Sequence, residues 1–353
     1  MEPSTERARI LRPVDVIPPA ATVLLALCGF VVGAPLPLGS DALRAWAEIA
    51  VVFGLLVIAP AVIERSELSE RARVYAGYGI FLAFAAFIVT TPTVGRPFDP
   101  LVIGVAALAA ALLGVLDRLK PGFSPLPFLH AWSALILAGM AYGNLGAIMP
   151  PPWRVFDDPL ARVDHAIFGT QLSLAIEPWS AGFWNDWFSF HYALYIAYPI
   201  AIGFVYYALG RREEFDRLFL RVSLSLWLGN VFYLLMPAAG PRLHLLSSYR
   251  GPLVGGALTH FQEGLVGGYG YHYDCFPSLH TACSLLAVFS LRRQFPRVFP
   301  VVLFFEANLI LSTVWLRQHW AIDVLAGIAF AIAVHVASTA IERVDLRRAV
   351  PAR

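Results

Sequence analysis

The most constraining feature of this 353-residue chain is its series of long apolar runs, which recur from the N-terminal region to the C-terminal region. An α-helix needs about 20 apolar residues to cross roughly 30 Å of hydrocarbon. The runs have about that length, and short segments with Arg, Pro and Gly separate them. The sequence therefore predicts an all-α, polytopic membrane protein.

About ten runs qualify as candidate membrane spans. They are residues 20–38, 46–63, 75–92, 101–117, 128–147, 184–208, 217–237, 278–291, 298–316 and 320–341. Trp and Tyr gather near several of their ends, where aromatic side chains typically anchor helices in the headgroup layer. A Pro-containing link near residue 122 divides the chain. We predict an N-terminal four-helix membrane region (1–122), a six-helix catalytic core (123–345) and a cytoplasmic tail (346–353).

Composition and charge exclude several protein classes. Hydrophobic residues make up 58% of the chain and charged residues only 14%, whereas a soluble domain has about a quarter charged residues. The net charge of +2 and the absence of a basic block with interleaved aromatics exclude a nucleic-acid binder. The three cysteines, Cys28, Cys275 and Cys283, have no metal-ligand spacing, and we interpret them as small buried hydrophobic residues.

The distribution of Lys and Arg predicts the orientation in the membrane. Basic residues are more numerous at both termini and in the even-numbered loops, so both termini should be cytoplasmic. The long loops at about 148–183 and 238–277 then lie on the extracytoplasmic side, and the amphipathic stretch 160–176 should lie in the headgroup layer. A single lysine among 26 basic residues indicates a GC-rich genome and hence a bacterial plasma membrane.

The first group of polar residues that could carry chemistry opens the run at 278–291. Pro277 and Ser278 form a helix-start pattern, and His280 falls in the first turn. The free amides at a helix N-terminus form an anion site. We therefore predict that Ser278 helps to bind a phosphate and that His280 lies beside it.

Two more groups lie at ends of candidate spans on the same predicted face of the membrane. His319 and Asp323 are four residues apart, so they share one helix face, and the carboxylate can fix the imidazole tautomer. Arg242 follows Pro241 just beyond another span and could clamp a phosphate. Because ionisable residues at membrane depth are costly, we predict that His280, His319 and Asp323 are catalytic and that Arg242 binds phosphate. No metal is assigned to this mechanism.

Some of these residues have simpler interpretations. A single histidine at a helix end is more often a satisfied interfacial residue than a catalyst, so the prediction depends on the set. Arg242 could instead be an ordinary headgroup-binding arginine. Glu306 and Arg221, which also lie inside candidate spans, could be buried partners of each other.

At these motifs the sequence resembles the type 2 phosphatidic acid phosphatase superfamily. The stretch at 275–282, Cys-Phe-Pro-Ser-Leu-His-Thr-Ala, is most similar to the inositol phosphorylceramide synthase branch. Ordinary phosphatases of the superfamily have Pro-Ser-Gly-His there, whereas this chain has Leu279 at the glycine position. The resemblance covers about residues 128–341.

A second motif of the superfamily reads Ser-Arg, five residues, His, three residues, Asp. Here the frame is Ser312 and Thr313, then His319 and Asp323, so Thr313 replaces the arginine that grips the phosphate. The lysine-containing first motif is not recognisable, and residues 237–242 occupy its place. These departures favour a synthase-like transferase over a simple phosphatase.

The resemblance implies a mechanism without a cofactor. His319 would attack phosphorus to form a phosphohistidine, Asp323 would orient it, and His280 would transfer protons. We predict transfer of a phosphate-linked headgroup, such as inositol phosphate, from a phospholipid donor to a hydroxyl-bearing lipid or polyol. The alternative is a lipid-phosphate or polyprenyl-diphosphate phosphatase that releases phosphate to water.

Two further alternatives remain open at the level of sequence. The first is a zinc hydrolase built on His280, His319 and Asp323, since three protein ligands and a water form a catalytic zinc site. The second is a transporter or channel, which would account for many spans and for the buried Glu306. The spans lack the paired broken helices that mark a midplane transport site.

Overall fold

The structure is a computed structural model that describes residues 40–69, 71–77, 79–80, 83, 125–143, 152, 154–267 and 271–349. Across these ranges the regular structure is helical, and two isolated β-bridges are the nearest approach to a strand. The predicted spans at 20–38 and 101–117 and most of the one at 75–92 lie outside the described residues. The chain divides into two compact units, one containing residues 36–150 and the other residues 151–353.

The described helices of the first unit are α2 (Ser40–Phe53), the π-helical segment η2 (Gly54–Ile58), α3 (Ala59–Arg65) and α6 (Pro125–Gly143). Pro60, near the start of α3, has no amide to donate, and Ala59 bonds five residues back to Gly54. The π-helical turn therefore lets the helix continue through the proline. α6 packs against α2 and α3 and belongs to this unit. The predicted boundary of the catalytic core at residue 123 stays a prediction.

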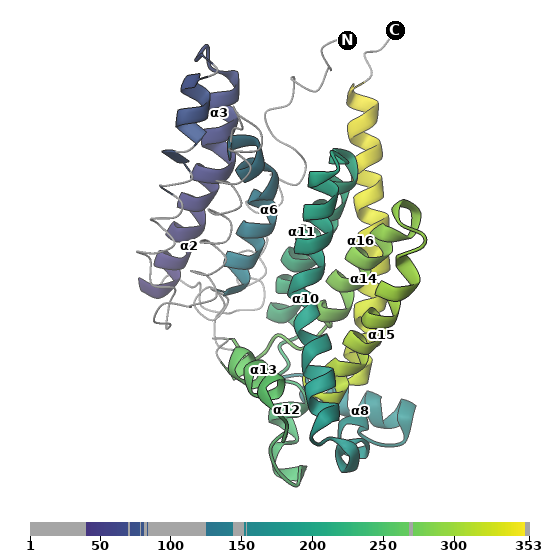
Figure 1. The fold of residues 1–353 in the computed structure, drawn as a ribbon. Helices are drawn as coiled ribbons and strands as arrows, with labels where there is room; N and C mark the ends of the chain where they lie inside the picture. Colours follow the sequence, from purple (N-terminus) through teal and green to yellow (C-terminus); the bar gives the residue numbers. More distant parts are fainter. Residues whose placement is uncertain are drawn as a thin grey trace. The chain divides into compact units, whose positions relative to one another are not determined.

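The second unit is a helical bundle with short helices at one end. Its elements are α8 (Asp157–Phe168), α9 (Leu172–Ala175), η3 (Glu177–Trp179), α10 (Phe183–Ala208), α11 (Arg212–Leu235), α12 (Pro241–His244), η4 (Leu246–Ser248), α13 (Ala257–Gly267), α14 (Leu279–Gln294), α15 (Phe299–Trp315) and α16 (Ala321–Ala349). α14 contacts each of α10, α11, α15 and α16 (Figure 1). Its buried small residues, including Ala282 and Ala287, allow neighbours to pack closely around it.

Two described helices are long and apolar enough to cross a membrane, α11 and the segment Ala321–Arg343 of α16. α10 is a third if its halves, Phe183–Tyr195 and Ala197–Ala208, form one span across their 48° bend. Pro199 explains the bend, because its ring displaces the carbonyl four residues earlier. The all-helical class and two to three spans are thus supported, while ten spans and a six-helix core remain predictions.

Candidate active site

The N-terminus of α14 presents His280. Ser278 is the N-cap, and its hydroxyl accepts hydrogen bonds from the amide of Thr281 at 3.3 Å and from the Thr281 hydroxyl at 3.1 Å. The Ser278 amide donates to the backbone oxygen of Asp323 at 3.1 Å. In this structure Ser278 therefore caps the helix and joins it to α16. Its predicted contact with phosphate stays a prediction.

The N-terminus of α16 presents the other two predicted catalytic residues. Asp323 lies in the first turn, and its Oδ2 accepts the amide of Trp320 at 2.8 Å. His319 Nδ1 is 3.6 Å from the same oxygen, which is an ion-pair separation rather than a hydrogen bond. Both side chains are buried. The structure thus places His319 and Asp323 together, in the pairing that their four-residue spacing predicts.

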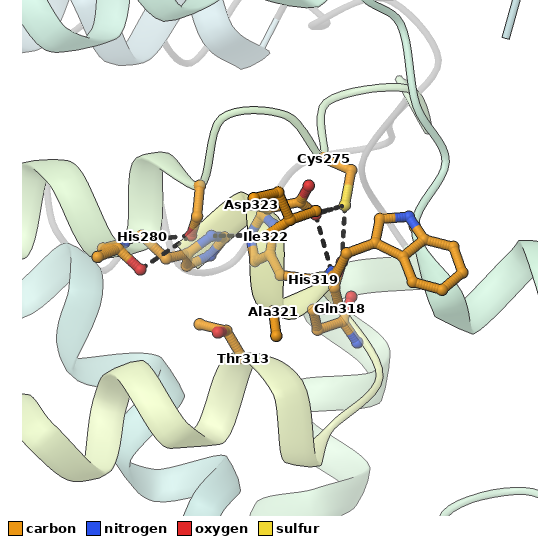
Figure 2. Close-up of polar contacts among 12 residues, drawn as sticks. Cys275, His280, Thr313, Gln318, His319, Ala321, Ile322 and Asp323 are labelled. Atoms are coloured by element: carbon orange, nitrogen blue, oxygen red, sulfur yellow. Dashed lines mark hydrogen bonds and ion pairs between the residues drawn. The ribbon is translucent and has the colours of Figure 1, made fainter. Parts of the chain in front are cut away.

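His280 of α14 meets His319, which precedes α16, with the two rings edge to face. His280 Nδ1 lies 3.1 Å from His319 Nε2 (Figure 2). The His280 ring also packs between the rings of Tyr192 and Tyr195 on α10, with centroids 4.5 and 4.3 Å away. Both ring nitrogens of His319 are therefore engaged, Nδ1 toward Asp323 and Nε2 toward His280. One nitrogen is oriented by a carboxylate while the other faces a group that can exchange protons.

Close approach of the backbone at this site depends on two glycines. A Cβ on Gly327 of α16 would lie 2.6 Å from the Ser278 oxygen, so only glycine lets α16 meet the start of α14. Gly240 has a φ of +82°, and a Cβ there would lie 2.7 Å from the Gln318 oxygen. Gly240 lets its loop pack against Gln318, next to His319, and Gly327 lets α16 pack against Ser278.

Cys275 is a member of the site that the sequence analysis interpreted only as a buried hydrophobic residue. Its thiol donates to Asp323 Oδ2 at 2.8 Å, and its sulfur is 3.5 Å from His319 Nδ1. Burial, reinforced by the Asp323 carboxylate, raises the pKa of this thiol well above its ordinary value. Cys275 and Cys283 are both free thiols. No signal in the chain indicated this contact, because Cys275 and Asp323 are 48 residues apart.

Two carboxylates of α8 hold the segments of the site in place, and neither is among the site residues predicted from the sequence. Asp164 accepts the amides of Ala321 at 2.9 Å and Ile322 at 2.7 Å, which are free donors at the start of α16. Asp157 accepts the amide of Gly240 at 2.7 Å, that of Ala239 at 2.8 Å and the Trp320 indole at 3.2 Å. Both aspartates are buried.

The electrostatics of α8 follow from this burial. Burial raises the pKa of Asp164, and its two amide hydrogen bonds oppose that shift. The prediction of an amphipathic stretch at 160–176 is partly matched, since α8 ends at Phe168 before Gly169, which has a φ of +72°. The sequence signal for the two aspartates was their seven-residue spacing, which puts both on one helix face.

The predicted phosphate ligand Arg242 has a carboxylate partner. Its guanidinium donates two hydrogen bonds to Glu263 of α13, at 2.9 and 2.8 Å. Its backbone amide donates to the Arg317 oxygen at 2.8 Å, so Arg242 lies close to the His319 segment. Arg317 itself donates to Glu177 at 3.1 Å and to the Gly251 oxygen at 2.8 Å. Glu263 takes two of the five N–H donors of this guanidinium, so a phosphate at Arg242 would share it with Glu263.

The structure does not pair Glu306 with Arg221. Glu306 is buried and accepts the Ser284 hydroxyl at 2.7 Å. Arg221 lies 3.8 Å from Glu342 and donates to the Ser338 hydroxyl at 3.3 Å. The suggestion that the two charges neutralise each other is wrong, because each has its own partner on another helix.

Comparison with known proteins identifies the family. A family model described as the PAP2 superfamily matches residues 159–337, about half of the chain. The matched segment includes His280, His319, Asp323 and Arg242. No curated protein and no solved structure gives a significant match. Members of this superfamily carry out phosphatase-type chemistry on phosphate esters, and the sequence motifs, the geometry of the two histidines and the family match agree: the chain belongs to the PAP2 superfamily.

Proposed function

We propose that this protein is a membrane phosphotransferase, which moves a phosphate-linked headgroup from a phospholipid donor to the hydroxyl of a lipid or polyol. The observation that carries the proposal is the approach of His280 Nδ1 to His319 Nε2 at 3.1 Å, with Asp323 beyond His319. A nucleophile with an orienting carboxylate and a neighbouring acid–base group is the arrangement that covalent catalysis requires.

The reaction then has two steps. In the first, His319 Nε2 forms a bond to phosphorus, the bond from phosphorus to the lipid oxygen breaks, and His280 gives that oxygen a proton. In the second, His280 takes the proton of the incoming hydroxyl, whose oxygen binds phosphorus and releases His319. Asp323 stabilises the positive charge on His319 in the intermediate. The proposal routes no step through a metal.

The departures from the phosphatase motifs favour an acceptor other than water. Leu279 stands at the usual glycine position and is buried, and it lies against Gly229 of α11. Thr313 stands at the usual arginine position, is also buried, and donates its hydroxyl to the Ile310 oxygen at 2.7 Å. An arginine that would hold a free phosphate is therefore missing at position 313. A diester headgroup carries less charge than a phosphomonoester and needs fewer cationic ligands.

The substrate and location follow the same proposal. Inositol phosphate is the headgroup that the inositol phosphorylceramide synthase-like motif suggests, with a glycerophospholipid donor and a lipid hydroxyl acceptor. We propose that the protein is an integral protein of a bacterial plasma membrane, with both termini cytoplasmic and the active site on the extracytoplasmic side. The charge distribution along the sequence supports this orientation.

The test is an assay of purified full-length protein in detergent with a panel of phospholipid donors, with and without lipid acceptors. We expect mass spectrometry to detect a headgroup phosphate on the acceptor, and we expect His319→Ala to abolish the product. His335→Ala is the matched control, because His335 is an exposed histidine of α16, the helix that follows His319. Free phosphate released equally well without an acceptor would favour the alternative, a lipid-phosphate phosphatase. Turnover unchanged in His319→Ala would refute both.

A further inference from the structure

Three side chains of different ligand type converge around His319. The sulfur of Cys275, a ring nitrogen of His319 and a carboxylate oxygen of Asp323 all lie within 4.8 Å of one another, and all three residues are buried. Figure 2 shows Cys275 on the Asp323 side of the His319 ring, away from His280. Cysteine, histidine and aspartate are the side chains that bind zinc in proteins.

The distances between the three atoms suit a zinc ion. Zinc bonds of about 2.3 Å to sulfur and about 2.0–2.2 Å to nitrogen or oxygen place tetrahedral ligand atoms roughly 3.4–3.6 Å apart. Cys275 Sγ is 3.5 Å from His319 Nδ1, and His319 Nδ1 is 3.6 Å from Asp323 Oδ2. The third separation, 2.8 Å from Cys275 Sγ to Asp323 Oδ2, must widen by less than about 1 Å.

An unsatisfied atom at the same place gives a second, independent indication of a ligand. Asp323 Oδ1 is buried and has no hydrogen-bond partner. Burying a carboxylate oxygen without a partner is costly, and such an atom in a folded protein calls for an explanation. A cation bound beside Asp323 would supply the missing interaction.

We propose that Cys275, His319 and Asp323 form a zinc site and that zinc bound there inhibits the enzyme. Binding displaces the Cys275 thiol proton to solvent, and the sulfur, His319 Nδ1 and Asp323 then coordinate the ion. Neutral His319 coordinated through Nδ1 carries its one proton on Nε2. The inhibitory part rests on the proposed function, in which Nε2 must have a free electron pair to attack phosphorus. Zinc binding and phosphohistidine formation are therefore mutually exclusive.

Metal binding is tested without any substrate. Full-length protein in detergent is stripped with a chelator, loaded with Zn²⁺ or Co²⁺ and freed of unbound metal. We expect one equivalent of zinc by elemental analysis and a thiolate-to-cobalt absorption band. Both should be lost in Cys275→Ala and in Cys275→Ser, which keeps a hydroxyl donor for Asp323. Cys283→Ala, at the other buried free thiol, should retain them. A band that persists without Cys275, or wild-type protein that binds no zinc, would overturn the site.

The inhibitory effect is tested separately with the transfer assay. We expect one equivalent of Zn²⁺ to lower turnover at least about 10-fold and a chelator to restore it. The Cys275→Ser variant should require at least about 100-fold more zinc for the same inhibition, since even outer-shell changes at zinc sites weaken binding 10- to 100-fold. Turnover that rises with zinc, or that is insensitive to it, would overturn the inhibitory role. If the metal-free wild-type protein showed no transfer activity, that result would count against the proposed function. The cobalt band would still show whether Cys275, His319 and Asp323 bind metal.

Discussion

Asp323 makes several contacts within the site. Its Oδ2 lies near His319 Nδ1, accepts the Trp320 amide and accepts the Cys275 thiol, while its backbone oxygen accepts the Ser278 amide. This residue therefore links His319 to the helix that carries His280. A substitution that changes only its charge separates the catalytic role from the structural one.

We expect Asp323→Asn to lower kcat by at least about 100-fold with little change in KM. The amide keeps the shape of the carboxylate, but it can stabilise the wrong imidazole tautomer and supplies no charge opposite the phosphohistidine. In the catalytic triad of serine proteases the same substitution lowers kcat roughly 10⁴-fold. Steady-state kinetics check the prediction, with size-exclusion chromatography as the control for folding. Activity within about 3-fold of the wild type would contradict the role of Asp323.

Arg242 and Glu263 carry the second prediction at this scale. If Arg242 binds the donor phosphate, Glu263 competes for the same guanidinium through its two hydrogen bonds. We expect Glu263→Gln to lower KM for the phospholipid donor about 3- to 10-fold, and Arg242→Ala to raise it by at least that factor. An unchanged KM in both variants would show that the pair acts only to join α12 and α13.

At the scale of elements, α8 connects the protein surface to the catalytic segment. Its buried face carries Asp157 and Asp164, while Val163, Ile167 and Phe168 are exposed on the rest of the helix. The exposed apolar residues fit the predicted place of this helix in the headgroup layer. The helix thus supports the site through amide hydrogen bonds rather than by touching the two histidines.

We expect Asp164→Ala to lower kcat by at least about 10-fold and Asp164→Asn to lower it less. Alanine leaves the buried Ala321 amide and the partly buried Ile322 amide without acceptors, at about 1–3 kcal/mol for each buried donor, and lets the start of α16 move. Asparagine retains one acceptor oxygen. The matched control is Asp158→Ala on the same helix, whose side chain is 75% exposed. Equal losses in Asp164→Ala and Asp158→Ala would refute a specific role in positioning.

Packing between α14 and α16 gives a prediction about stability. A Cβ on Gly327 would meet the Ser278 oxygen at 2.6 Å, so Gly327→Ala must push the two helices apart at the site. We expect the unfolding free energy in detergent to fall by about 1–3 kcal/mol, together with activity. Gly264→Ala in α13 is the control, because a Cβ there meets nothing within 4 Å, and its stability should be unchanged or slightly raised. A similar melting temperature in both variants would contradict the packing argument.

At the scale of the whole molecule, the bundle of the second unit has two chemically different ends. The helix α14 begins beside His280 and ends at Gln294, where Arg211 donates to the Gln294 side chain at 2.7 Å. Arg292 and Arg293 lie in its last turn. The site and this arginine-rich end are therefore at opposite ends of one buried helix, as the positive-inside pattern predicts for an extracytoplasmic site.

Labelling of single introduced cysteines tests this orientation in intact cells. We expect a membrane-impermeant maleimide to label Ser248→Cys, which is exposed beside the site, without permeabilisation. Arg293→Cys, exposed at the other end, should react only after permeabilisation. The unmodified protein is the control, since its described cysteines are buried. The opposite labelling pattern would place the active site in the cytoplasm.

The sequence by itself determined the class of this protein and the centre of its site. Long apolar runs require helices in lipid. The short spacing of His319 and Asp323 brings them together, with His319 just before α16 and Asp323 in its first turn, so both features follow from local geometry. The number of spans was less well determined. Hydropathy depends only on which residues a segment contains. It does not distinguish a helix that faces lipid from one that, like α14, is enclosed by other helices.

Only the tertiary structure decided which residues surround that centre. Cys275 reaches His319 from 44 residues away, and Asp164 reaches the amides of Ala321 and Ile322 from more than 150 residues away. Asp157 reaches the Gly240 amide from 83 residues away, and Glu263 reaches Arg242 across 21 residues. Such contacts depend on the packing of α8, α13, α14 and α16, which residue spacing along the chain does not encode. The histidine pair was therefore visible in the sequence, whereas the carboxylates that support it, the Glu263 partner of Arg242 and the proposed metal site required the fold.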